Sequence, residues 1–214
     1  MDEGLLTHVE RSRAAAFLAL QDRQDFIAAH LLVRMCAGQL LGIDPGRLEV
    51  VQRCAGCRRE GHGKPSLAGL PDMHISFSHT RCVVAAAAGW DLVGIDIESQ
   101  TRSSVQPDVM RQVLTSSELR ILERHPYPTT ALLRHWVRKE ALIKVGRATL
   151  DTLHQLDLSS LLSDEPTTPL WRTQFDGLHL LEWADDRHGV VCAVAGTHSP
   201  RLGVAAMPLS DVST

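Results

Sequence analysis

The chain has 214 residues and a net charge of −3, with 44% hydrophobic and 22% charged residues. This is the composition of an ordinary globular protein, long enough for one domain or for two small lobes with a real core. The charge argues against a general nucleic-acid binder, and the longest strongly apolar run, residues 83–88, is too short to span a bilayer.

The first half of the chain is predicted to hold two helices followed by strands. The second helix runs from Asp22, a good N-cap residue, to a stop at Gly42. Alternating or apolar segments separated by glycine and proline then predict strands at residues 48–53, 74–77, 82–88 and 92–98.

The second half is predicted to be helical first and β-rich afterwards. Helices are expected at residues 105–114, after the capping pattern Thr115-x-x-Glu118, and from about 130 to 147. A polar loop at 163–169 precedes two β-like runs, 178–183 and 190–195. The pattern predicts two α+β lobes, residues 1–100 and 101–214, with a boundary near residues 99–104.

The N-terminus is acidic and lacks the basic and then apolar layout of a signal peptide. The chain has five cysteines, an odd number that cannot all pair in a disulfide framework. Both features favour a protein of the reducing cytoplasm.

Basic residues are unevenly distributed. Residues 101–147 carry nine arginines or lysines against four acids, a local charge of +5 that leaves −8 for the rest. This stretch is either a docking surface for an acidic partner or a helix with solvated arginines. The chain has only three lysines, Lys64, Lys139 and Lys144, and a compact ammonium suits a phosphate.

Two carboxylates lie on one face of the strand expected at 92–98. Residues 93–98 read Val-Gly-Ile-Asp-Ile-Glu, so Gly94, Asp96 and Glu98 point the same way. Oxygen ligands beside a glycine suit Mg²⁺, which shares its coordination with substrate phosphates. The alternative is a half-buried strand with a wet outer face.

A third carboxylate lies on the long helix. Trp136, Glu140 and Lys144 are spaced by four residues and share one helix face. Because that face continues an apolar stripe, Glu140 needs a partner, which a metal could supply. The alternative is a surface pair between Glu140 and Lys144.

Two weaker signals come earlier in the chain. Residues 61–65, Gly-His-Gly-Lys-Pro, are predicted to form a turn that lets backbone and Lys64 approach a phosphate-bearing ligand, or a plain surface turn. Residues 76–80, Ser-Phe-Ser-His-Thr, end a strand with groups that could hold a phosphate, although a single histidine is usually structural.

Together and in this order these segments resemble the Sfp-type 4′-phosphopantetheinyl transferases. The matching pieces are Gly63-Lys64-Pro65, Ser78-His79, Gly94-Ile95-Asp96-Ile97-Glu98 and Trp136-x-x-Lys139-Glu140-Ala141-x-x-Lys144. The resemblance runs from about residue 10 to residue 196. It implies an α+β fold of two similar subdomains related by a pseudo-twofold axis, with coenzyme A in the cleft between them.

The resemblance also implies an activity: Mg²⁺-dependent transfer of the 4′-phosphopantetheine arm of coenzyme A to a serine of an acyl or peptidyl carrier protein, releasing 3′,5′-ADP. Asp96, Glu98 and Glu140 are the implied metal ligands. Glu140, Lys144 and Asp96 are the implied catalytic residues, with Glu140 as base and Lys144 on the phosphates. The implied coenzyme A contacts are Arg13, Arg59, Gly63, Lys64, Ser78, His79, Asp96 and Lys144.

The implied partner is a carrier protein that is acidic around its serine, with Val113-Leu114 as an apolar contact. No nucleic-acid or membrane partner is expected, and one chain with both lobes can act as a monomer. Two other functions stay open: a Mg²⁺-dependent coenzyme A pyrophosphate hydrolase, and a non-catalytic module that binds coenzyme A or a carrier. The pathway served, whether polyketide, nonribosomal peptide, siderophore or fatty acid, is also open.

The chain departs from the family pattern in places. Ser76 stands where relatives have an asparagine, Ala148 replaces a glycine beyond Lys144, and Asp25 stands where many carry a basic residue.

Cys54-x-x-Cys57 is half of a zinc site at best. Although His62 lies nearby, no second pair of ligands is visible, so a structural loop is expected there.

Overall fold

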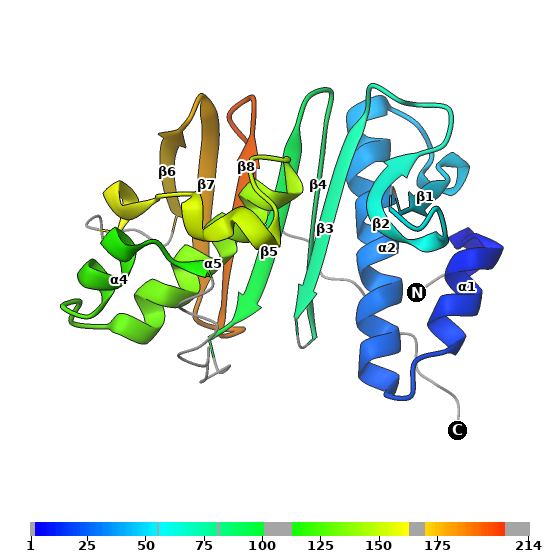
Figure 1. Cartoon of the computed structure of the whole chain (residues 1–214). Coiled ribbons are helices and arrows are strands. Elements are labelled where there is room, and N and C mark those ends of the chain that lie inside the picture. The colour runs from blue at the N-terminus through cyan, green and yellow to red at the C-terminus, as the bar shows by residue number, and fades with distance from the viewer. Residues whose placement is uncertain (1–2, 55, 81, 101–112, 163–169, 204–214) are drawn as a thin grey trace. The chain divides into compact units, whose positions relative to one another are not determined.

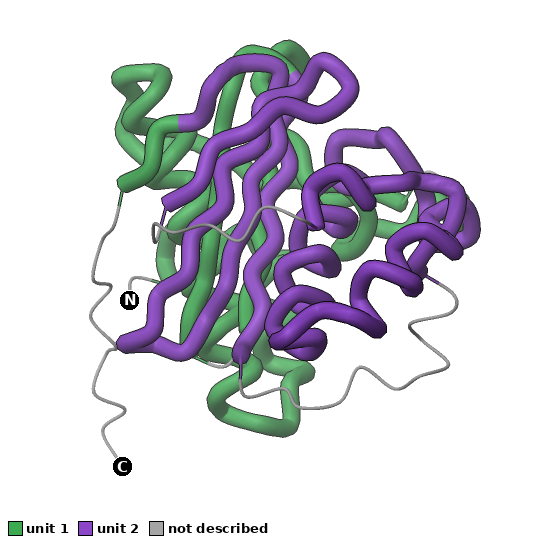
Figure 2. The backbone as a smooth tube through the Cα atoms, turned by 90° about the vertical axis from the view of Figure 1, so that its left-hand side faces the viewer, with its two compact units in different colours: residues 1–91, 201–214 green, residues 92–200 purple. Residues whose placement is uncertain are grey.

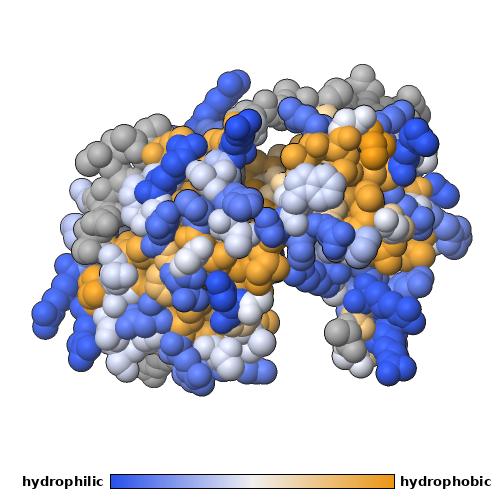
Figure 3. Space-filling view, turned by 90° about the horizontal axis from the view of Figure 1, so that it is seen from above, coloured by the Kyte–Doolittle hydropathy of each residue, from blue (hydrophilic) through white to orange (hydrophobic). Residues whose placement is uncertain are grey.

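The structure is a computed structural model that describes residues 3–54, 56–80, 82–100, 113–162 and 170–203. Its internal contacts divide the chain into two compact units, residues 1–91 with 201–214, and residues 92–200 (Figure 2). We describe each unit by itself. No helix among the described residues has the length and hydrophobicity that crossing a membrane requires, and hydrophilic and hydrophobic residues intermix on the face drawn in Figure 3.

The first unit combines two helices with a four-stranded antiparallel sheet of order β1-β2-β3-β4 (Figure 1). A short 3₁₀ helix, Glu3–Leu5, comes before the helices, and a second, Pro45–Arg47, lies between α2 and β1. The helices and strands are α1 (His8–Ala15), α2 (Leu20–Leu41), β1 (Val50–Arg53), β2 (Glu60–Leu67), β3 (His74–Thr80) and β4 (Val83–Gly89).

Helix α2 packs on β3 and β4 and forms the core of the first unit with them. Its apolar side chains, including Val33 and Ala37, meet Val50 and Ile75 from the sheet. The helix ends where the sequence predicts: Gly42 adopts a left-handed φ of 66°, and its N–H donates to the carbonyl of Gly38. It begins at Leu20, two residues earlier than predicted.

The second unit also consists of helices and one antiparallel sheet, but these elements follow one another along the chain in a different order. Its antiparallel sheet runs β5-β8-β7-β6, and α5 packs on β5 and β8 (Figure 1). Its elements are β5 (Val93–Ser99), α4 (Ser116–Leu122), α5 (Pro128–Lys144), the 3₁₀ helices Leu150–Gln155 and Ser159–Leu161, β6 (Leu170–Phe175), β7 (Leu178–Asp185) and β8 (Val190–Gly196). The whole is a mixed α and β protein with two four-stranded sheets.

Strand β8 is the centre of the second unit. All seven of its residues are buried, which explains why Val190–Gly196 reads as one apolar run. It pairs with β5 along the full length of that strand, from Val93 opposite Gly196 to Ser99 opposite Val190. The contacts therefore place β5 in the second unit and the division between Asp91 and Leu92.

Most of the predicted elements are present, and two strands were missed. Strand β2 contains the segment expected to be a turn, and β6 was not predicted. The segment 61–64 is a bulge within β2: Gln52 pairs with Pro65, but the next residue, Arg53, pairs with Glu60. The predicted helix 105–114 and loop 163–169 lie largely outside the described residues.

Candidate active site

Strand β5 and helix α5 approach each other closely at Gly94. A Cβ atom on Gly94 would lie 2.4 Å from the carbonyl oxygen of Ala141 and 2.9 Å from the Cβ of Lys144. Only a residue without a side chain permits this approach. Because side chains alternate along a strand, Asp96 and Glu98 share the face on which Gly94 meets the helix.

Asp96 is held by the last turn of α5. The ammonium of Lys144 donates to the Asp96 Oδ1 at 2.8 Å and to the carbonyl of Ile95 at 2.7 Å. Asp96 is 6% exposed, so this face of the strand is not the wet one that the alternative interpretation requires. The side chain of Lys144 keeps 27% of its surface exposed, which leaves it reachable from solvent.

Glu140 lies close enough to the other two carboxylates to feel their charges. Burial raises its pKa above the ordinary value, the negative charges of Asp96 and Glu98 raise it further, and the charge of Lys144 lowers it. The structure therefore brings the strand carboxylates and the helix carboxylate into one electrostatic cluster. The interpretation of Glu140 as merely the partner of Lys144 on a surface does not fit, because Lys144 is bonded to Asp96.

This donor set fits a hard divalent cation. Its carboxylate oxygens are hard ligands, and burial first, then the charges of Asp96 and Glu98, disfavour an ionised Glu140 that has no cation beside it. The carboxylates do not form a tight cage: among the described residues, three ligand atoms all within 4.8 Å of one another occur elsewhere, at Cys54, Cys57 and His62. An open arrangement suits Mg²⁺, which keeps several waters and is completed by substrate phosphates.

A buried ionic network lies under the same helix. The ammonium of Lys139 donates to the Glu118 Oε2 at 2.8 Å, and also to the carbonyls of Val113 at 2.7 Å and Leu153 at 3.1 Å. The other Glu118 oxygen contacts His135 Nε2 at 2.6 Å. Lys139 and Glu118 are both fully buried.

This network corrects one expectation and reveals a residue that the sequence reading overlooked. Lys139 is enclosed by protein acceptors, so it does not serve a phosphate as the scarcity of lysine suggested. Burial alone would raise the pKa of Glu118, but hydrogen bonds and charge from His135 and Lys139 lower it to about 2. The only signal was the capping pattern Thr115-x-x-Glu118, which the structure confirms as a capping box.

The basic stretch 101–147 is largely neutralised within its own unit. Arg134 and Arg138 both pair with Glu182 of β7, and Arg147 pairs with Asp176. With Lys139 and Lys144 also paired, five of the seven described basic residues in this stretch have acidic partners. The described part of the stretch is therefore no broad basic surface, and the arginines are not simply solvated.

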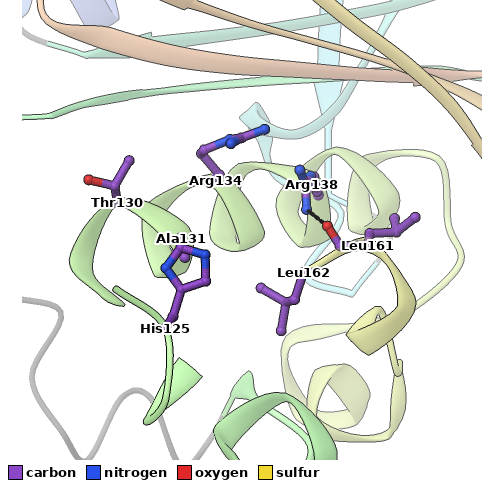
Figure 4. Close-up of a pocket in the computed structure, with 7 residues that line it drawn as sticks. All are labelled: His125, Thr130, Ala131, Arg134, Arg138, Leu161 and Leu162. Carbon is purple, nitrogen blue, oxygen red and sulfur yellow. Dashed lines mark hydrogen bonds between the residues drawn. The ribbon is translucent and has the colours of Figure 1, made fainter. Parts of the chain in front are cut away.

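The two arginines also border a small pocket of about 20 Å³, room for one water molecule (Figure 4). Arg138 donates to the carbonyl of Leu161 across it. The pocket is lined by His125, Thr130, Ala131, Arg134, Arg138, Leu161 and Leu162. None of the predicted site residues lines it.

Val113 and Leu114, predicted to contact a carrier protein, are buried. They are 6% and 3% exposed and pack with Leu122, Ala131 and Leu153. The carbonyl of Val113 also accepts from Lys139. These residues belong to the core of the second unit, so this prediction is wrong: similarity to a segment that meets the carrier in relatives did not show that these two side chains point inward.

In the first unit, Arg13 and Gly63 are connected through one side chain. Gln52 accepts from the Arg13 guanidinium at 3.0 Å and donates to the carbonyl of Gly63 at 3.1 Å. Arg13 also stacks on the Phe26 ring at 4.9 Å, and burial lowers its pKa. The structure thus assembles Arg13 and the Gly-Lys-Pro segment, two of the predicted coenzyme A contacts.

The other predicted contacts of the first unit lie at or near the surface. Arg59, Lys64 and His79 are exposed, and Ser78 is half-buried. Ser78 and His79 lie at the end of β3, whose pairing with β2 is at Ser66 and His74. Their role in binding coenzyme A remains a prediction.

Comparison with known proteins bears on this geometry. Residues 92–195 match the family described as the 4′-phosphopantetheinyl transferase superfamily. The matched range contains the four residues Asp96, Glu98, Glu140 and Lys144 and nearly all of the second unit.

Two curated relatives carry the same description. A 4′-phosphopantetheinyl transferase of Bacillus subtilis is 28% identical over 138 residues, which cover 63% of this chain and 57% of that protein. The 4′-phosphopantetheinyl transferase HetI of Nostoc sp. is 26% identical over 202 residues, 89% of this chain and 79% of that protein. The chain thus spans little more than half the length of the Bacillus relative.

Proposed function

We propose that this protein is an Sfp-type transferase that moves the 4′-phosphopantetheine arm of coenzyme A to a serine of an acyl or peptidyl carrier protein. The observation that carries the proposal is the convergence of Asp96 and Glu98 of β5 with Glu140 and Lys144 of α5. The comparisons support phosphopantetheine transfer as the activity class. Mg²⁺, held by the three carboxylates, is part of the proposal.

In this proposal a carrier serine hydroxyl attacks the phosphorus that bears pantetheine. The pyrophosphate bond on the other side of that phosphorus breaks, and 3′,5′-ADP leaves. Asp96, Glu98 and Glu140 would hold Mg²⁺, which would supply a Lewis acid for the developing phosphate charge. We assign the removal of the serine proton to Glu140 and the stabilisation of the leaving group to Lys144.

Glu140 is suited to receive the serine proton. A carboxylate can act as a general base, and Glu140 lies beside Asp96 and Glu98 at the proposed metal site. Lys144 is suited to the leaving group, because its ammonium is part-exposed at the same cluster. Its positive charge would stabilise the departing phosphate of 3′,5′-ADP.

The first unit is proposed to recognise the remainder of coenzyme A. Arg13, held by Gln52 beside the Gly63 carbonyl, offers a fixed positive charge, and Lys64 offers an exposed one. Arg59, Ser78 and His79 complete the proposed set.

The decisive experiment offers coenzyme A and Mg²⁺ to an apo-carrier protein and weighs the carrier by mass spectrometry. Transfer adds about 340 Da to the carrier and releases 3′,5′-ADP in equal amount. A Mg²⁺-dependent hydrolase would release 3′,5′-ADP and leave the carrier mass unchanged. Binding of coenzyme A or carrier without any product would favour the non-catalytic module.

A matched pair of variants ties the activity to the site. Asp96→Asn keeps the size of the side chain and removes a charge from the proposed metal site, whereas Asp151→Asn changes an exposed acid of the same unit. We expect the first to lose at least about 100-fold in kcat/KM and the second to keep full activity. Full transfer by Asp96→Asn would overturn the proposed site.

A further inference from the structure

Three side chains of the kind that bind zinc come together in the first unit. The sulfur atoms of Cys54 and Cys57 and a ring nitrogen of His62 all lie within 4.8 Å of one another. The Cys57 Sγ and the His62 Nε2 are 3.1 Å apart. The sequence indicated the cysteine pair with His62 nearby, and the structure brings the three side chains together.

The backbone between the cysteines and β2 is tightly closed. The N–H of Cys54 donates to the carbonyl of Arg59 at 3.0 Å, and the N–H of Arg58 donates to the carbonyl of Cys54 at 2.9 Å. Arg58 adopts a left-handed φ of 60°, unusual for a residue with a side chain. The loop therefore reverses the direction of the chain and leads into β2, which contains His62.

Gly63 brings the histidine strand against the first cysteine. A Cβ atom on Gly63 would lie 2.8 Å from the carbonyl oxygen of Arg53 and 2.9 Å from the Cα of Cys54, and its φ is 100°. No other residue fits at that position without displacing the backbone. The neighbouring His62 is therefore fixed beside Cys54 by the backbone, independently of any ligand.

Two backbone donors are directed at the sulfur of Cys54. The N–H groups of Cys57 and Gly56 donate to it. Amide donors in this position offset part of the negative charge that a metal-bound cysteine sulfur carries. The backbone of the loop therefore supports a sulfur that acts as a metal ligand.

We propose that Cys54, Cys57 and His62 bind one zinc ion. Two thiolates and one imidazole are a ligand set that Zn²⁺ prefers, and its fourth position would be filled by water or by a ligand from outside. Tetrahedral zinc with ordinary bond lengths separates a sulfur and a nitrogen ligand by about 3.5 Å. The observed 3.1 Å needs a shift of only a few tenths of an ångström.

The site would secure the bulge that carries Gly63 and Lys64. Zinc would tie the end of β1 to the start of β2 across the irregular pairing between Arg53 and Glu60. This role of the zinc site rests on the proposed function, in which Lys64 contacts coenzyme A. The zinc site itself does not depend on it.

The test measures metal directly. The full chain is expressed in zinc-supplemented medium, purified under reducing conditions, desalted and analysed for zinc by plasma mass spectrometry. We expect about one zinc per chain in the wild type and less than about 0.1 in Cys57→Ser and His62→Asn. The matched controls Cys82→Ser and His154→Asn change an exposed cysteine and an exposed histidine outside the cluster and should keep the metal.

A rescue variant guards against loss of folding. His62→Cys removes the imidazole but offers a third thiolate, so it should recover zinc that His62→Asn loses. Replacing zinc by Co²⁺ should give thiolate-to-cobalt absorption in the wild type and none in Cys57→Ser. Zinc-free wild type after reconstitution, equal zinc in the ligand variants, or a Cys54–Cys57 disulfide under these conditions would each overturn the proposal.

The metal assay and the transfer assay separate the two proposals. Zinc bound without carrier modification would contradict the proposed function and leave the zinc site standing. Carrier modification by a zinc-free protein would do the reverse. If both proposals hold, removal of zinc should raise the KM for coenzyme A more than it lowers kcat, because the ion would position Lys64 and not the reacting phosphate.

Discussion

Glu140 shows how a residue that lowers the stability of the fold can suit the proposed chemistry. Burial disfavours its ionised form, and the charges of Asp96 and Glu98 disfavour it further, so its pKa rises. In the unfolded chain the same carboxyl ionises with an ordinary pKa near 4.5. Ionised Glu140 therefore destabilises the folded protein once the pH exceeds that value.

Glu140→Gln should therefore stabilise the protein when divalent metal is chelated. An amide of the same shape carries no charge, so at pH 7 we expect a higher Tm than in the wild type. Added Mg²⁺ should raise the Tm of the wild type and leave that of the variant nearly unchanged, while the variant loses at least about 100-fold in transfer. Differential scanning fluorimetry with EDTA or Mg²⁺ measures both shifts.

The exposed Glu123 at the end of α4 provides the control. Glu123→Gln removes one negative charge from the same unit without touching the cluster, so it should behave as the wild type does. A lower Tm for Glu140→Gln in EDTA would mean that the carboxylate stabilises the fold, contrary to the raised pKa. An unchanged Mg²⁺ effect in that variant would exclude Glu140 as a ligand.

The positions of the carboxylates on their strand and helix follow from local rules, whereas the partner of Lys139 does not. Asp96 and Glu98 follow from the alternation of a strand, and Glu140 and Lys144 from the four-residue spacing of a helix, both local rules. Lys139 lies on the same helix but pairs with Glu118, 21 positions earlier. Because helix capping already accounted for Glu118, nothing local indicated that it also binds a buried ammonium.

Helix α5 and strand β5 pack closely together at one point. The approach occurs where Gly94 faces Ala141, and it brings the strand carboxylates to the helix face that carries Glu140 and Lys144. The position of Glu140 relative to Asp96 is thus set by a missing side chain. A glycine between apolar residues does not reveal from the sequence whether another element packs against it. The packing role of Gly94 could therefore not be predicted, although the positions of Asp96 and Glu98 could.

Gly94→Ala should separate these two elements. The new methyl group would lie 2.4 Å from a backbone carbonyl of α5, which cannot be relieved by a side-chain rotation. We expect a loss of about 1–3 kcal/mol in the free energy of unfolding and a fall in kcat, because helix and strand must move apart. Urea denaturation and the carrier assay give the two values.

Gly203→Ala is the matched control, since a Cβ at Gly203 meets nothing within 4 Å. It should leave stability and transfer unchanged. Wild-type stability for Gly94→Ala would show that α5 is not held against β5 as the structure has it.

Strand β2 shows why some elements escaped prediction. Gly61 and Gly63 have φ values of 86° and 100°, which regular strands do not adopt, so the segment carries the residues of a turn. Its strand character comes from pairing with β1, a contact between separate segments of the chain. In contrast, β8 needed no partner to be recognised, because all its residues are apolar or small.

At the scale of the whole molecule, pH acts on two carboxyls of the second unit in opposite directions. Glu140 costs stability above its ordinary pKa, whereas Glu118 contributes stability there. Burial alone would raise the pKa of Glu118, but His135, Lys139 and the Leu158 N–H together lower it to about 2. A pKa lowered on folding stabilises the protein above the unfolded value of 4.5, and this stabilisation is lost as the pH falls toward 2.

Acid unfolding should therefore begin at Glu118. Between pH 4.5 and about 2 the wild type should lose about 3 kcal/mol through this group, the equivalent of the lowered pKa. Glu118→Gln should be less stable at pH 7 by about 3–5 kcal/mol, because it leaves the buried Lys139 ammonium without a counter-charge. Its stability should also fall less steeply in acid, because the amide takes up no proton.

Urea denaturation at a series of pH values measures both effects, and Glu118→Gln with Lys139→Met provides the internal control. Removing both charges should restore part of the stability at pH 7 while keeping the shallower acid slope, because no buried ion is then left unpaired. The free energy of unfolding of Glu118→Gln could instead fall with pH as steeply as that of the wild type between pH 5 and 2.5. The proton whose uptake destabilises the fold in acid would then bind a group other than Glu118. The helix that presents Glu140 and Lys144 would then be anchored by something other than the Glu118–Lys139 pair.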